Sequence, residues 1–152
     1  MRGFTLFLSL ALFGIGGMIY VLFRSLSLKM FSWFESLGWI DQIIRFRGEV
    51  QHWELPMWAK FALPDGLWVF SYILLIGCIW NFDYLKAKCV MFLLPLIAIG
   101  SELLQAIHVV KGTFDSVDLL CYSGATLAGW LYVYGVKRVL YKIKNEMCIA
   151  FL

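Results

Sequence analysis

Four long apolar runs, at residues 4–23, 66–82, 89–110 and 117–136, constrain this chain more than any other feature. A helix needs about 20 apolar residues to cross about 30 Å of hydrocarbon. The chain of 152 residues is 62% hydrophobic with a mean hydropathy of +0.80, which is typical of membrane proteins and not of soluble domains. We therefore predict an all-α, polytopic membrane protein with four transmembrane helices in a single domain, residues 1–152.

The distribution of positive charge predicts the orientation of these helices. Four spans place both termini on one side of the membrane, together with the short turn between the second and third runs. This side carries dense basic segments, including a tail, 137–152, that contains Lys137, Arg138, Lys142 and Lys144. By the positive-inside rule we expect both termini in the cytoplasm and the tail at the membrane surface. The net charge of +3 gives no indication of a nucleic-acid partner.

The first loop, residues 24–64, is long for so small a protein, and its composition indicates order. Its apolar residues at helical spacing are Trp33, Leu37, Ile40 and Ile44. Four of the seven tryptophans also fall in this loop, and tryptophan favours the headgroup level of a bilayer. We expect amphipathic interfacial helices on the outer leaflet, with residues 33–44 helical across the end of the bundle. Such helices serve either as a lid over an amphiphile site or as a plain interfacial anchor.

Acidic and amide residues lie in or beside the apolar runs and fall toward the same face of the membrane as the first loop. Glu102 is eight residues before the end of the third run, about 12 Å deep at 1.5 Å per residue. A carboxylate at that depth usually has a partner or a function. We predict a polar pocket at this face, formed by Asp65, Glu102, Gln105, Lys111, Asp118 and Tyr122.

Simpler roles are open for several of these residues. Asp65 follows a proline and suits a helix N-terminus. Asp118 stands three residues after Asp115, which suits an N-cap followed by an acidic residue in the first turn. Gln105 suits a hydrogen bond between helices. Glu102 has no such local explanation, so the sequence favours a role for its carboxyl group in the pocket.

Common catalytic and metal-binding motifs are missing from the sequence. It contains no G-x-S-x-G, no H-E-x-x-H and no glycine-rich phosphate loop. The four cysteines show no C-x-x-C spacing, so neither a disulfide framework nor a zinc site is indicated. We assign no catalytic residue and expect no metal and no cofactor, which favours a role other than catalysis.

The acidic residues carry a resemblance to the VanZ-like family. The hallmark of that family is an E-x-x-Q pattern in one helix, a short loop, and an aspartate that opens a helix with small residues. Glu102, Gln105 and Asp118 follow this order, and the start of the second run at Asp65 is also similar. The resemblance covers about residues 63–130.

The chain departs from the family pattern at several positions. Thr113 stands where an arginine is usual, Tyr122 where an asparagine is usual, and Ala125 where a glycine is usual. The second run also lacks a usual histidine. The resemblance implies a bacterial inner-membrane protein, some relatives of which lower sensitivity to the lipoglycopeptide teicoplanin.

Three hypotheses of function follow. The first is a non-enzymatic protein that binds a lipid or amphiphile at the outer leaflet, in envelope maintenance or glycopeptide-type antibiotic tolerance. The second is a structural or accessory subunit of a larger membrane complex, or a homo-oligomer, with Gly14, Gly16 and Gly17 of the first run as a packing face. Small residues at a spacing of four in the last apolar run, Gly124 with Ala128 and Ala125 with Gly129, also allow close helix approach. The third is a membrane enzyme that acts on a lipid headgroup, with Glu102 and Asp118 as acid and base.

Overall fold

The computed structural model describes residues 1–50 and 52–150, and side chains up to residue 146. This part of the chain contains eight α-helices and no strand. Three segments are long and apolar enough to cross a membrane: Arg2–Phe23, Tyr84–Ala106 and Ser116–Glu146. Leu63–Ile79 is apolar but shorter. The prediction of an all-helical chain with membrane-crossing helices is confirmed at this level.

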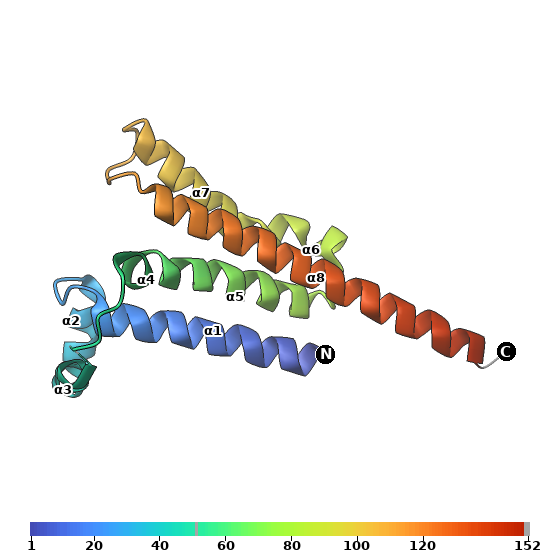
Figure 1. Ribbon diagram of the computed structural model, residues 1–152, viewed down its shortest axis with the longest axis horizontal. Coiled ribbons are helices and arrows are strands. Elements are labelled where there is room, and N and C mark those ends of the chain that lie inside the picture. The colour runs from blue at the N-terminus through green and yellow to red at the C-terminus, as the bar shows by residue number, and fades with distance from the viewer. Residues whose placement is uncertain (51, 151–152) are drawn as a thin grey trace.

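The long helices lie roughly along one axis, and each runs in the direction opposite to the preceding one in the sequence (Figure 1). The first is α1 (Arg2–Phe23), followed in the first loop by α2 (Lys29–Ser36), α3 (Ile40–Val50) and α4 (Met57–Phe61). The chain then forms α5 (Leu63–Ile79), α6 (Tyr84–Met91), α7 (Leu93–Ala106) and α8 (Ser116–Ala150).

The two ends of the bundle differ in what they contain (Figure 1). One, here called the loop end, holds α2, α3, α4 and the α7–α8 connection. The other, here called the terminal end, holds the N-terminus, the α5–α6 turn and the C-terminal part of α8. The N-terminus and the C-terminal part of α8 therefore lie toward the same end of the bundle.

Helix α5 is the centre of the bundle because it packs against both α1 and α8. Its Ile73 lies against Gly129 of α8, where an added Cβ would be 2.9 Å from Ile73 Cγ2. On the opposite side, Trp68 packs on Gly16 of α1 and donates from Nε1 to the Phe13 carbonyl at 3.2 Å. Glycine at these positions permits the close approach of the helix axes.

The small residues of the sequence divide into packed and open positions. Gly16 and Gly129 are contact points, whereas an added Cβ at Gly14, Gly17 or Gly124 would meet nothing within 4 Å. The packed face of α8 therefore contains Gly129 and not Gly124. The glycines of α1 do not form one continuous packing face.

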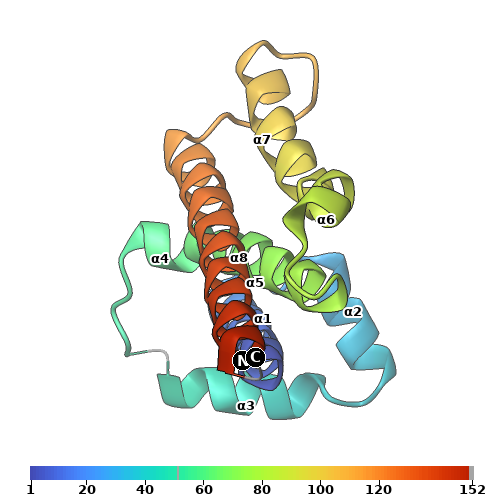
Figure 2. The same cartoon turned by 90° about the vertical axis from the view of Figure 1, so that its right-hand side faces the viewer.

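The first loop is helical, but the single helix expected over residues 33–44 is wrong. Gly38, at φ +73°, breaks it into α2 and α3. The Gly38 amide donates to the Glu35 carbonyl and the Trp39 amide to the Phe34 carbonyl, each at 2.9 Å. This is a Schellman ending, which favours glycine at the left-handed position. Figure 2 shows α3 running across the direction of α1.

Arg47 of α3 fastens the loop helices to the end of α1. Its guanidinium donates to the Val21 carbonyl at 2.6 Å and to the Arg24 carbonyl at 2.9 Å. The last carbonyls of a helix have no hydrogen-bond donor within the helix, and Arg47 supplies a donor to two carbonyls at the end of α1. The position of α3 is thus tied to the loop end of α1.

The predicted third span, 89–110, has different limits in the structure. The helix begins at Tyr84, is interrupted at Phe92 between α6 and α7, and ends at Ala106. Pro95 explains the interruption because it has no amide hydrogen for the preceding turn. His108, at φ 60°, occupies the left-handed position after the helix end. Glu102 therefore lies about 6 Å from the helix end, not about 12 Å.

The other predicted limits also differ from those of the structure. The second span, predicted at 66–82, is α5 at Leu63–Ile79 and also ends in a Schellman motif, with the Phe82 amide bonded to the Gly77 carbonyl at 2.7 Å. The fourth, predicted at 117–136, is the start of α8, which continues as one helix to Ala150. The predicted basic tail, 137–152, is thus helical, and its last two residues lie outside the described part of the chain.

Candidate functional site

A polar cluster lies at the loop end of the bundle, where four long helices begin or end. Asp65 is in the first turn of α5, Glu102 is in the last part of α7, and Asp118 is in the first turn of α8. Arg24 follows the end of α1, and Tyr122 is one turn beyond Asp118. We call these five residues the loop-end cluster.

Arg24 supplies the positive charge of the cluster. Its Nη2 lies 3.7 Å from Asp65 Oδ2, and the two side chains are 25% and 19% exposed. The same nitrogen donates to the Phe61 carbonyl at 3.4 Å. The guanidinium also lies over the rings of Tyr20 and Phe61, at 5.0 and 4.9 Å from their centroids. These contacts hold Arg24 toward the start of α5.

Glu102 holds the connection between α7 and α8. Its side chain is buried, and Oε2 accepts a hydrogen bond from the Asp115 amide at 3.2 Å. Asp115 Oδ1 in turn accepts from the Val117 amide at 2.8 Å, which is the geometry of an N-cap. The helix-start interpretation of Asp115 is confirmed. Glu102 thereby positions the first turn of α8.

Gln105 and Lys111 belong to the same connection. The Gln105 amide packs on Gly112, where an added Cβ would be 2.6 Å from Gln105 Oε1. Gly112 has φ +148°, a backbone conformation that favours glycine, and the side chain of any other residue there would also collide with Gln105. Lys111 is exposed and belongs to none of the ion pairs among the described residues. Gln105 therefore packs against the α7–α8 connection, whereas Lys111 is exposed.

Asp118 and Tyr122 face Asp65 from α8. The two helices approach closely here, because a Cβ added at Gly66, next to Asp65, would be 3.3 Å from the Cβ of Cys121. Asp118 Oδ1 is buried and has no hydrogen-bond partner among the described residues. The loop-end cluster contains three carboxyl groups and one guanidinium, and this excess of acidic groups favours a cationic partner.

Arg24 is the cluster residue that sequence analysis missed. It was assigned only to the first loop, because the sequence around a cation in a loop does not show which carboxylate it contacts in the fold. Its position directly after the first apolar run was the available signal, since that position places it at the same end of the bundle as Asp65.

An apolar cavity of about 370 Å³ lies between α1, α5 and α7. Its lining residues are Ser9, Leu10, Phe13, Trp68, Ser71, Tyr72, Leu75 and Leu94. The polar atoms of this lining are occupied: Ser9 donates to the Ser71 carbonyl at 2.8 Å, and Tyr72 to the Val90 carbonyl at 2.5 Å. Trp68 bonds to α1, as described above. The cavity therefore presents an almost wholly apolar surface.

Comparison with protein-family models, with curated proteins and with solved structures gives no match to this chain. The resemblance to the VanZ-like family therefore rests on the sequence pattern described above. In the described part of the chain, no three His, Cys, Asp or Glu side chains are grouped so that they can hold a metal ion. Cys78, Cys89 and Cys121 are free thiols.

Proposed function

We propose that this chain is a multi-pass bacterial inner-membrane protein that binds a lipid or amphiphile without chemical conversion. In this proposal α1, α5, α6–α7 and α8 form four transmembrane spans, with both termini cytoplasmic. The first loop lies on the outer leaflet, and α2 and α3 are its amphipathic interfacial helices. The VanZ-like pattern links the protein to envelope maintenance or glycopeptide-type antibiotic tolerance.

The observation that carries this proposal is the apolar cavity between α1, α5 and α7. Leu10 and Phe13 lie near the middle of the 22-residue α1, so the cavity opens close to the bilayer midplane. The acyl chains of a lipid end at this depth. A volume of about 370 Å³ is within the usual range of small-molecule sites. Because its polar atoms are already bonded, the cavity suits a hydrocarbon chain better than a polar group.

The first loop supports the position of the ligand at the outer leaflet. Its four tryptophans are more than half exposed: Trp33 at 68%, Trp39 at 53%, Trp53 at 58% and Trp58 at 52%. Exposed indole rings at one end of a membrane protein favour the headgroup region. In the proposal they hold the loop at the surface beside the loop-end cluster. The shortage of positive charge in that cluster favours a headgroup that carries an ammonium.

A second candidate function is supported by α7. Its outer face exposes large apolar side chains, including Leu96 at 68%, Ile97 at 60% and Leu103 at 51%. The helix packs mainly on α8 and only slightly on α5. A helix with so broad an apolar flank also suits contact with another subunit, in which case the protein is an accessory subunit or homo-oligomer.

The proposal is tested by filling the cavity. Leu10→Trp places a large ring in it, whereas Leu127→Trp makes the same change at an exposed position of α8 outside it. Lipid binding to the purified chain is measured by native mass spectrometry with a dioleoyl phospholipid series. We expect Leu10→Trp to remove the tightest-bound lipid and Leu127→Trp to retain it. Equal lipid binding in the two variants would contradict the proposal and favour the subunit hypothesis.

A further inference from the structure

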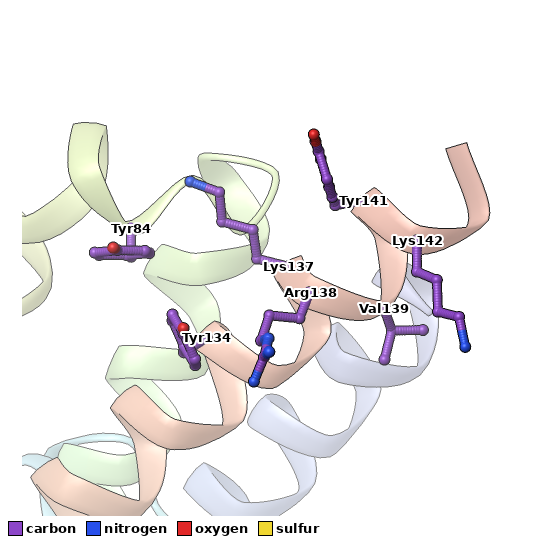
Figure 3. A pocket seen from close by; sticks show the side chains of 7 residues that line it. All are labelled: Tyr84, Tyr134, Lys137, Arg138, Val139, Tyr141 and Lys142. Atoms are coloured by element: carbon purple, nitrogen blue, oxygen red, sulfur yellow. The ribbon is translucent and has the colours of Figure 1, made fainter. Parts of the chain in front are cut away.

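A second pocket, of about 580 Å³, lies at the terminal end of the bundle and shares no lining residue with the apolar cavity (Figure 3). It is formed by the start of α6 and by residues 134–142 of α8. Its polar lining consists of Tyr84, Tyr134, Lys137, Arg138, Tyr141 and Lys142. We call it the basic pocket. Three cationic side chains and three phenol rings line it, and none of its described lining residues is a carboxylate.

The cations of the basic pocket differ in how far their charge is used within the protein. Lys137 is paired, because its Nζ donates to Asp83 Oδ1 at 2.9 Å and lies 4.8 Å from the centroid of the Tyr84 ring. Arg138 lies over the Tyr134 ring, at 5.8 Å from its centroid, and has no ion pair among the described residues. Its guanidinium is thus free to bind an anion.

Lys142 is the second available cation. It lies 3.9 Å from Glu146, and the two side chains are 80% and 66% exposed. An ion pair so exposed has little net stability, so it does not prevent Lys142 from binding another anion. Figure 3 shows Arg138 beside Tyr134 and Lys137 extended toward the start of α6. The lining of the pocket therefore includes a planar guanidinium, an exposed ammonium and phenol hydroxyls.

The depth of the pocket indicates which anion it meets. The first 21 residues of α8, Ser116 to Val136, are mostly apolar, and the basic segment follows at once. Tyrosine rings gather where the hydrocarbon gives way to headgroups. A phosphate in the headgroup layer is thus at the level of Arg138 and Tyr134. Guanidinium groups bind phosphate oxygens through paired hydrogen bonds.

We propose that the basic pocket binds the phosphate of an anionic phospholipid in the leaflet at the terminal end. The six Lys and Arg residues of α6 and α8 around it outnumber Asp83 and Glu146, so the region attracts an anionic lipid surface as well. The pocket adds a defined contact to that general attraction. This site lies at the terminal end of the bundle, outside the apolar cavity proposed above as a lipid site, and does not rest on it.

The experiment compares two doubly substituted proteins of equal charge. Arg138→Gln with Lys142→Gln removes the free cations of the pocket. Lys88→Gln with Lys144→Gln removes two exposed charges from the same helices outside it. Dioleoylphosphatidylglycerol binding to the full-length chain is measured by native mass spectrometry. Dioleoylphosphatidylcholine and glycerol 3-phosphate serve as the zwitterionic and water-soluble comparators.

We expect both variants to lose the same general attraction, about fivefold for each surface cation removed. We expect the pocket variant to bind phosphatidylglycerol about tenfold or more weakly than the control variant, because it also loses the defined contact. Phosphatidylcholine binding should change little in either. Equal losses in the two variants would overturn the proposal, because they indicate only general charge attraction. Displacement by glycerol 3-phosphate at the same concentration as the lipid would overturn the assignment to a lipid.

Arg138→Lys gives an independent measurement, since it keeps the charge and removes the fork. The side chain of Arg138 is exposed, so this change leaves the fold intact. We expect phosphatidylglycerol binding between that of the parent chain and that of the pocket variant. Binding equal to that of the parent would overturn the assigned role of the guanidinium.

Discussion

The packing of α8 on α5 gives a prediction whose size follows from the structure. Gly129→Ala adds a methyl group that would lie 2.9 Å from Ile73 Cγ2 and 3.0 Å from Ile73 Cβ. Carbon atoms pack best at about 3.5–4.0 Å, so the new methyl is about half an ångström or more too close. Ile73 is fully buried and β-branched, so it has little freedom to move away.

The expected effect is the sum of two opposing terms. Overpacking costs about 1–3 kcal/mol, whereas alanine in place of glycine favours the helix by about 1 kcal/mol. Gly124→Ala, in the same helix, gains the second term without the first, because nothing lies within 4 Å of its new methyl. The helix-propensity term cancels between the two variants. We therefore expect Gly129→Ala to be less stable than Gly124→Ala by about 1–3 kcal/mol.

The assay is reversible unfolding in mixed detergent micelles, followed by tryptophan fluorescence, with both variants measured under the same conditions. Gly77→Ala provides a second measurement from the α5 side, since its methyl would lie 2.7 Å from Val133 Cγ2. If Gly129→Ala is as stable as Gly124→Ala, α8 does not pack on α5 through Gly129 and the reasoning is refuted.

Three further predictions concern polar contacts. Glu102→Gln keeps an acceptor for the Asp115 amide at the start of α8 and should change the free energy of unfolding by less than about 0.5 kcal/mol. Glu102→Leu removes that acceptor and should cost about 1 kcal/mol. Equal costs of the two variants in detergent unfolding would contradict this. The hydrogen bond from Lys137 lowers the pKa of Asp83. The pair therefore stabilises the fold above about pH 4, near the pKa of Asp83 in the unfolded chain, and this stabilisation is lost as the pH falls through the lower pKa of Asp83 in the folded chain. Thermal unfolding from pH 3 to 7 should show this loss in the parent chain and not in Asp83→Asn; the same acid loss in both would refute it. Arg47→Met should destabilise the protein by about 2 kcal/mol because two charged hydrogen bonds to the end of α1 are lost. Arg45→Met should cost about 0.5 kcal/mol or less, because Arg45 makes no such bond within the described part of the chain. Equal losses in the two variants would argue against the role of Arg47 at the end of α1.

The helices themselves were predictable because long apolar runs leave a chain few alternatives. Their limits were harder. A glycine is a common end of a helix, so Gly38 predicted the end of α2, and the expectation of one helix over residues 33–44 did not take it into account. His108 carries no comparable signal: it adopts the left-handed conformation usually reserved for glycine, so the end of α7 at Ala106 was not visible in the pattern.

The candidate site was predictable only in part. The shared topology of the helix ends indicated that Asp65, Glu102 and Asp118 lie at one end, and the structure places them there. Which partner each residue finds depends on tertiary contacts that local spacing does not specify. Arg24 and not Lys111 lies beside the carboxylates. The apolar cavity depends on the angle between helices and leaves no mark in the sequence of any one of them.

The most direct measurement of the proposed function is the position of a bound acyl chain. The full-length protein, reconstituted in nanodiscs, is photolysed with a phospholipid that carries a diazirine at the end of one acyl chain, and the labelled residues are identified by peptide mass spectrometry. We predict labelling concentrated on Leu10, Phe13, Leu75 and Leu94, which line the cavity. Labelling spread evenly over the exposed outer faces of α7 and α8, with none enriched at the cavity, would contradict the account.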